Sequence, residues 1–153
     1  LFILHPDFRS SYAISPAVSE PDSKLMRIDF LPRPGARSPA VMELKGREYP
    51  IAWEGSAWID PATASVVRIL ASWKEPPPEL GLRQLRSDVH YGPTLLTQGD
   101  PYWLPQDAKI ELETQHQRWR NEHHFSNYHR FSVDVREEVG GARPLEPAEG
   151  GKK

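Results

Sequence analysis

The 153-residue chain has 38% hydrophobic residues, a net charge of −2 and no cysteine. This charge gives no attraction to nucleic acid, and the missing cysteine excludes disulfides, thiolate metal ligands and a cysteine nucleophile. No apolar run reaches the roughly 18 residues that span a bilayer. Sixteen prolines, about twice the usual share of roughly 5%, predict short elements separated by loops.

The chain begins with an apolar stretch, "LFILHPDF", that has neither an initiator methionine nor the shape of a signal peptide. We therefore expect the later part of a longer protein. "SPAVSEPDS" (15–23) predicts a mobile loop. In "KLMRIDFL" Met26, Ile28 and Phe30 share one face, because alternate residues of a strand point to the same side.

A Pro/Gly loop is predicted over residues 31–39, followed by two short strands. "AVMELKG" places Met42 and Leu44 on its apolar face. "YPIAWEG" carries Ile51 and Trp53 and leads directly into a longer hairpin.

That hairpin, "EGSAWIDPATASVVRIL", is the clearest pattern in the chain. Asp60 and Pro61 suit the first two positions of a type I turn, since Asp accepts backbone N–H bonds and Pro has its φ preset. The outgoing strand is apolar on both faces, which predicts cover on both sides. We assign Trp58 of the incoming strand and Ile69 of the outgoing strand to the concave apolar face of a sheet.

Three prolines in "KEPPPELG" (74–81) predict the start of a short helix over residues 79–86. "RSDVHYG" then predicts a strand with Val89 and Tyr91 on one face. After a turn cluster at 97–105, "AKIELET" predicts a strand with Ala108, Ile110 and Leu112 on one face.

The final strand region is "RWRNEHHFSNYHRFSVDVRE", with a kink or turn predicted near Asn127. Residues 137–153 lack periodicity and predict a disordered tail. Strands about ten residues apart without intervening helices predict an antiparallel meander. We expect a mainly β protein, with seven or eight strands in one curved antiparallel sheet and little helix, forming a single domain over residues 1–136.

Histidines raise the question of a metal site, because His123, His124 and His129 cluster near Glu122. Neighbouring strand residues alternate faces, and residues six apart lie about 20 Å from each other. The sequence therefore predicts no metal site, although a bend at Asn127 would bring some of these groups closer.

Other chemistry finds equally little support. The basic-aromatic run around Trp119 resembles a single-stranded nucleic-acid surface, but its alternation predicts a solvated outer face. Glu111 and Glu113 share their strand face with Lys109, which predicts a surface stripe. No nucleophile elbow, dinucleotide fingerprint or P-loop pattern occurs. We predict no catalytic residue, no cofactor, and no enzyme.

The hairpin motif "GSAWIDPATASVVRI", the strand "SDVHYGP" and "YWLPQDAKIELE" followed by "NYHRFSV" resemble the bacterial lipoprotein-carrier superfamily (LolA/LolB/RseB-like) over residues 25–136. This resemblance implies a half-open antiparallel barrel whose apolar concave face, under helical lids, binds lipoprotein acyl chains outside the cytoplasm. The chain departs from that pattern because it lacks long amphipathic helices.

The resulting expectation is a non-enzymatic periplasmic or outer-membrane-associated domain without a transmembrane segment. It would bind a lipid or an acylated protein and no nucleic acid. The alternative is a structural or interaction module that pairs with another protein chain through exposed sheet edges. The predicted ligand-binding residues share the apolar face: Met26, Ile28, Phe30, Met42, Leu44, Trp58, Ile69 and Leu112.

Overall fold

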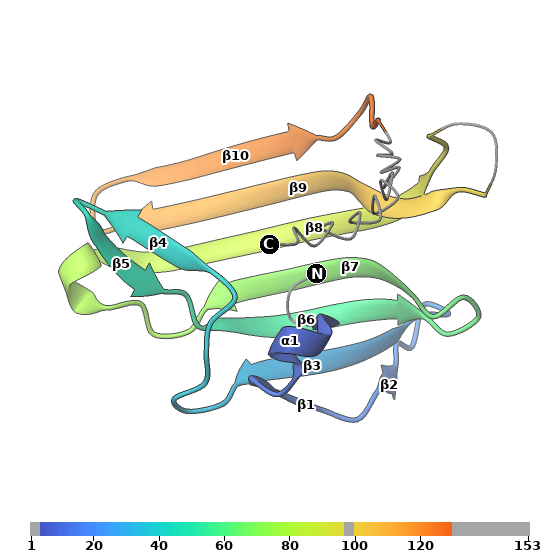
Figure 1. The fold of residues 1–153 in the computed structure, drawn as a ribbon, viewed down its shortest axis with the longest axis horizontal. Helices are drawn as coiled ribbons and strands as arrows, with labels where there is room; N and C mark the ends of the chain where they lie inside the picture. Colours follow the sequence, from blue (N-terminus) through green and yellow to red (C-terminus); the bar gives the residue numbers. More distant parts are fainter. Residues whose placement is uncertain (1–3, 97–99, 130–153) are drawn as a thin grey trace, which may run out of the picture.

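The structure, a computed structural model, describes residues 4–96 and 100–129. Antiparallel strands make up most of this part of the chain, with one short α-helix and one short 3₁₀-helix (Figure 1). The elements in chain order are α1 (Pro6–Arg9), β1 (Tyr12–Ile14), β2 (Val18–Ser19), β3 (Met26–Pro32), β4 (Val41–Leu44), β5 (Arg47–Pro50), β6 (Trp53–Asp60), β7 (Ser65–Trp73), η2 (Pro78–Leu80), β8 (Leu82–Thr94), β9 (Tyr102–Thr114) and β10 (Arg118–His124).

The main sheet has eight strands in the order β1-β3-β6-β7-β8-β9-β10, with β2 also paired to β3. Every pairing is antiparallel, and β6 to β10 follow one another as a meander (Figure 1). Strands β1 and β10 lie at opposite edges, so the sheet is open rather than closed into a barrel. The predicted antiparallel β architecture and strand number are confirmed, and β4 and β5 add a separate two-stranded sheet.

The turn between β6 and β7 forms as its residues predict. The Asp60 Oδ1 atom accepts a hydrogen bond of 2.9 Å from the backbone N–H of Ala62. A β-bulge shifts the register after Trp58, so that Ile59 pairs with Val66 instead of Val67. Val66 therefore joins Ile59 on the buried face, although simple alternation from Ile69 would place Val67 there.

Two small elements lie on the same side of the sheet, α1 over β3 and β6 and the β4–β5 hairpin farther along (Figure 1). Helix α1 begins with a proline, and the His5 Nδ1 atom accepts the Asp7 N–H at 3.3 Å. The hairpin turns through Lys45 and Gly46, whose φ values of 53° and 74° suit the left-handed turn that two-residue hairpins require. We call the side of the sheet that these elements contact the inner face.

The prediction of a helix over residues 79–86 is wrong. Only the 3₁₀-helix η2 forms, and it ends at Gly81, whose φ of 62° is left-handed. After Gly81 the chain forms strand β8 instead, because pairing with β9 buries Leu85 opposite Leu112. The loop predicted at 15–23 contains the two-residue strand β2. The predicted tail at 137–153 lies outside the described residues, as does the end of the predicted domain beyond residue 129.

Candidate functional site

One end of the inner face is a closed core beneath the N-terminal segment. Phe30 is 1% exposed and meets the Tyr12 ring edge to face, with centroids 5.9 Å apart. Leu4 and Phe8 pack against this cluster from above the sheet. The buried members of this first cluster are Tyr12, Ile28, Phe30, Ala57, Ile69 and Ala71.

A second core cluster lies beneath the β4–β5 hairpin. Tyr49 of the hairpin and Ile51 just after it are buried against Trp73 of β7 and Leu85 of β8. Met42 and Leu112 pack against its margin and are partly buried. This hairpin therefore covers the inner face near one end of β7, β8 and β9.

The inner face continues past both clusters without cover from the described residues. On β9, Ile110 is 38% exposed, and on β10 Trp119 is 49% exposed. Ladder pairing puts both on the inner face, because Leu112 pairs with Leu85 and Trp119, and Ile110 lies two residues before Leu112. We call this surface the open inner face: Val89, Ala108, Ile110, Leu112 and Trp119.

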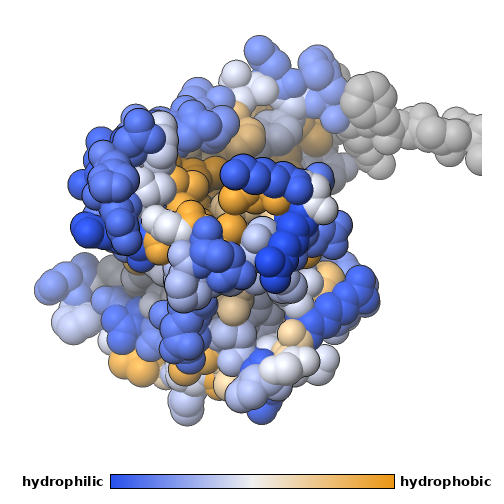
Figure 2. Space-filling model, turned by 90° about the vertical axis from the view of Figure 1, so that its left-hand side faces the viewer, coloured by the Kyte–Doolittle hydropathy of each residue, from blue (hydrophilic) through white to orange (hydrophobic). Residues whose placement is uncertain are grey.

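Figure 2 views the end of the molecule at which the β4–β5 turn lies. Apolar side chains there line a hollow whose rim is hydrophilic. An apolar surface recessed behind a polar rim is typical of a site that receives an apolar partner.

The predicted site residues divide between core and margin. Ile28, Phe30 and Ile69 lie in the first cluster, where they hold the sheet to the N-terminal segment. Met26 is partly buried opposite Ile59. These residues carry the fold, and in this structure they do not line an open surface.

Two of the other predicted residues lie at the second cluster. Met42 and Leu112 adjoin the second cluster, and Leu112 continues directly into the open inner face. Leu44 is 43% exposed at the end of β4, next to the hairpin turn. Of the eight predicted residues, Leu112 is the one that forms part of this surface.

Trp58 lies on the outer face, and its predicted place beside Ile69 is wrong. It pairs with Arg27 of β3 and with Arg68 of β7, whose guanidinium lies 4.8 Å from the centre of the indole. Its neighbour Ala57, 0% exposed, takes the inner position. The alternation of side chains along β6 places Trp58 outward despite the size of its indole, and the cation–π contact with Arg68 accounts for an aromatic ring on this polar surface.

Ile110 and Trp119 are the functional candidates that the list of predicted residues omitted. Both have the parity of the apolar face, so alternation alone was sufficient to find them. Their importance comes from being uncovered, which depends on where α1 and the hairpin pack.

The outer face is a ladder of paired charges. Arg68 donates two hydrogen bonds, of 2.8 and 2.6 Å, to the Asp88 carboxylate, and these hold the pKa of Asp88 below its usual value. Glu111 lies within 3.5 Å of Lys109, Arg118 and Arg120. The hydrogen bonds from Lys109 and Arg120 likewise lower the pKa of Glu111. Such a surface is already satisfied and favours solvent over an apolar ligand.

Histidines do not converge on a metal site in the described part of the chain. His123 pairs with Ala108 on the inner face, whereas His124 lies on the outer face with its Nδ1 atom 2.8 Å from an Asp107 carboxylate oxygen. Across residues 4–96 and 100–129, no group of three or more His, Asp or Glu side chains is placed to hold a metal ion.

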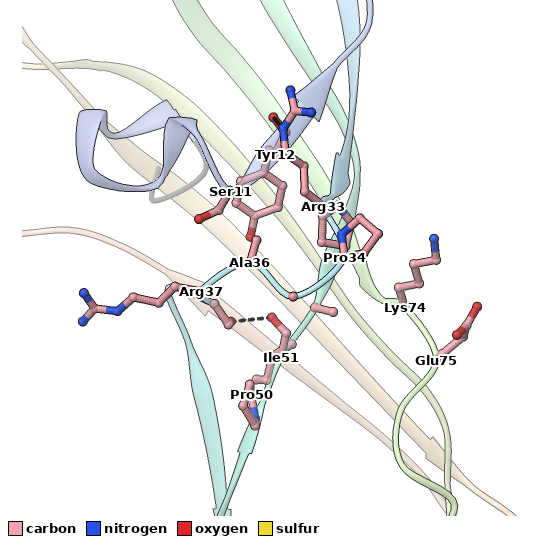
Figure 3. Close-up of a pocket in the computed structure, with 14 residues that line it drawn as sticks. Ser11, Tyr12, Arg33, Pro34, Ala36, Arg37, Pro50, Ile51, Lys74 and Glu75 are labelled. Carbon is pink, nitrogen blue, oxygen red and sulfur yellow. Dashed lines mark hydrogen bonds between the residues drawn. The ribbon is translucent and has the colours of Figure 1, made fainter.

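A hollow of about 310 Å³ lies beside the β3–β4 loop (Figure 3). Its three cationic side chains point in different directions instead of toward a common centre (Figure 3). Arg33 donates a hydrogen bond of 3.2 Å to the Tyr12 carbonyl, and Arg37 lies 5.7 Å from the centre of the Phe8 ring. These contacts join the loop to the N-terminal segment, so we assign the hollow a structural role and not a binding role.

No protein-family model, curated protein or solved structure matches the chain. The likeness to the lipoprotein carriers thus stays a prediction from sequence motifs. Within the described residues, no helix combines the length and apolar character needed to cross a membrane.

Proposed function

We propose that the protein is a non-enzymatic binding domain that takes up the acyl chain of a lipid or of an acylated protein on the open inner face. One observation carries this proposal. Ile110 and Trp119 extend the apolar inner face beyond its two covered clusters, and both are exposed. Uncovered apolar surface on one face of a sheet favours an apolar partner.

The binding would work by burial alone. Each acyl methylene removed from water contributes about 0.8 kcal/mol, so about ten methylenes give roughly 8 kcal/mol before the cost of ordering the chain. Ala108 provides room for the chain, while Ile110 and Trp119 supply apolar contact area.

The polarity of β10 suggests an orientation for the ligand. Asn121 and His123 are exposed and share the inner face with Trp119. The apolar end of this row lies at Trp119, opposite Leu112 and beside the second cluster. We expect the acyl tail to point toward the hairpin and the polar head to lie near Asn121 and His123.

The cellular setting is proposed on the resemblance to the lipoprotein carriers. Members of that superfamily bind acyl chains outside the cytoplasm, so we propose a periplasmic or outer-membrane-associated location. The open sheet with one apolar face is compatible with such a carrier, and here short elements cover part of that face in place of long lid helices.

Fluorescent fatty-acid titration tests the proposal. Ile110→Glu should weaken binding by about tenfold or more, because a carboxylate would face the acyl chain in a dehydrated site. The matched control is Leu31→Glu, since Leu31 is 49% exposed on the outer face of β3. A wild-type protein that binds no fatty acid, or an Ile110→Glu variant that binds like the wild type, would contradict the proposal.

An interaction function through sheet edges is the second candidate, and one observation favours it: all seven residues of β10 are exposed. The two functions use different surfaces, the open inner face and the free edge of β10. Variants can therefore remove either function separately.

A further inference from the structure

The two edges of the main sheet differ in how open they are to pairing. At one edge β1 has three residues and β2 has two, with Pro16 between them. Short strands and proline are common devices that prevent edge pairing. At the other edge β10 is seven residues long, has no proline, and pairs with no described strand on its far side.

The β9–β10 ladder determines which backbone groups of β10 face outward. The Thr114 N–H donates to the Gln117 carbonyl and the Phe125 N–H donates to the Gln106 carbonyl, each at 2.8 Å. In an antiparallel ladder, hydrogen-bonded pairs alternate with non-hydrogen-bonded pairs. Trp119, Asn121 and His123 therefore bond to β9. The N–H and C=O groups that point to the free edge belong to Arg118, Arg120, Glu122 and His124.

We propose that β10 pairs antiparallel with β10 of a second copy of this chain, about a two-fold axis through Asn121, to form one continuous sheet. In this register Arg118 lies opposite His124 of the second copy, and Arg120 lies opposite Glu122 of the second copy. These four residues carry the outward-facing backbone groups, so each pair can exchange two backbone hydrogen bonds.

Charge selects this register over its neighbours. A two-fold axis through Arg120 would place two arginines directly opposite each other, and an axis through Glu122 would do the same with two glutamates. Like charges directly opposite each other destabilise a strand pair. A two-fold axis that passes between two residues would place residues whose backbone groups face the free edge opposite residues whose backbone groups face β9. About Asn121, the sequence "RWRNEHH" thus brings Arg120 and Glu122 of the two copies into oppositely charged pairs.

On the outer face Glu122 is the side chain most open to a new partner, whereas Arg120 also donates two hydrogen bonds of 3.2 Å to Glu111. Glu122 is 66% exposed, and its nearest ion pair, with Arg120 of its own strand, measures 3.8 Å. Charged edge strands ordinarily discourage pairing with an arbitrary partner. Here the same charges favour a copy of the strand itself.

The inner face gains contact area as well. In the proposed register Trp119 lies opposite His123 of the second copy, in a non-hydrogen-bonded pair where side chains approach most closely. Two such aromatic pairs would cover part of Trp119, which is 49% exposed in the single chain. The inference rests on the interaction function, and the pairing itself needs no acyl chain, although Trp119 belongs to both surfaces.

Sedimentation equilibrium on lipid-free protein tests the pairing with two charge-reversal variants. Arg120→Glu and Glu122→Arg each place like charges opposite each other, so each alone should dimerise roughly tenfold more weakly than the wild type. An equimolar mixture should form a heterodimer with near wild-type affinity, because both glutamates of one variant, at positions 120 and 122, then face arginines of the other. Glu43→Arg, on the exposed face of β4, is the matched control and should dimerise like the wild type.

Circular dichroism melting identifies any variant that fails to fold. If a charge-reversal variant does not fold, Glu122→Pro is tested in its place, because the backbone N–H of Glu122 faces the free edge and not β9. A monomeric wild type, a mixture that associates no better than its components, or a proline variant that dimerises like the wild type would overturn the pairing. Fatty-acid titration of the same samples reports the acyl-chain function separately, so failure of one is distinguishable from failure of the other.

Discussion

Replacing Phe30 with alanine should lower the free energy of unfolding by about 3–5 kcal/mol. The Phe30 side chain is 1% exposed and is packed against Tyr12, Ile28 and Ala57 in the first cluster. Truncation removes the apolar contacts and leaves a cavity beneath the N-terminal segment. Backbone ladders with β1 and β6 on both sides of β3 limit how far the surroundings can collapse into it.

Urea denaturation followed by tryptophan fluorescence measures this effect. Phe125→Ala is the control, since Phe125 is 39% exposed and lies beyond the end of β10. We expect the control to lose no more than about 0.5 kcal/mol. A loss below about 1 kcal/mol for Phe30→Ala would show that the first cluster is not the main core of the domain.

Gly55→Ala should destabilise the protein by about 3 kcal/mol or more, because the added methyl group would collide with the backbone. A Cβ atom at Gly55 would overlap the Leu70 carbonyl oxygen and lie 2.9 Å from the Ala71 Cα atom on β7. Backbone atoms of a central strand cannot move aside as a flexible side chain can. Gly55 pairs with Phe30 on one side and Ala71 on the other, so the clash would also disturb the first cluster.

Thermal unfolding of Gly55→Ala alongside Gly92→Ala gives a matched comparison. Gly92 is also buried in a strand, but a Cβ atom there would meet the Gln106 side chain at 3.1 Å. That side chain can shift, so Gly92→Ala should lose much less stability. Equal losses in the two variants would mean that β6 and β7 do not approach as closely as described.

Local sequence patterns predicted the strands and the β6–β7 turn well. Alternation placed Ile28 and Phe30 on the buried face, and Asp60 and Pro61 marked the turn. The bulge after Trp58 was not predictable, because one extra residue in a strand leaves no distinct local signal. The helix predicted near Glu79 failed because pairing of β8 with β9 overrode a helix signal limited to one turn.

The candidate site was predicted only in outline. Alternation gives the parity of Ile110, Leu112 and Trp119, but it does not say which part of an apolar face is covered. Cover depends on long-range packing by Phe8 of α1 and by Tyr49 of the hairpin. The residues with the strongest apolar alternation are therefore buried in the core, and the open inner face is formed mainly by residues of β9 and β10.

Quenching of tryptophan fluorescence by a brominated fatty acid tests the central claim most directly, because bromine quenches only a nearby indole. Trp119 lies on the open inner face and Trp58 on the outer face, so they report opposite sides of one sheet. We predict that the wild type is quenched, that Trp119→Phe loses most of the quenching, and that Trp58→Phe retains it. Absence of quenching in the wild type, or its loss in Trp58→Phe but not in Trp119→Phe, would contradict acyl-chain binding at the open inner face.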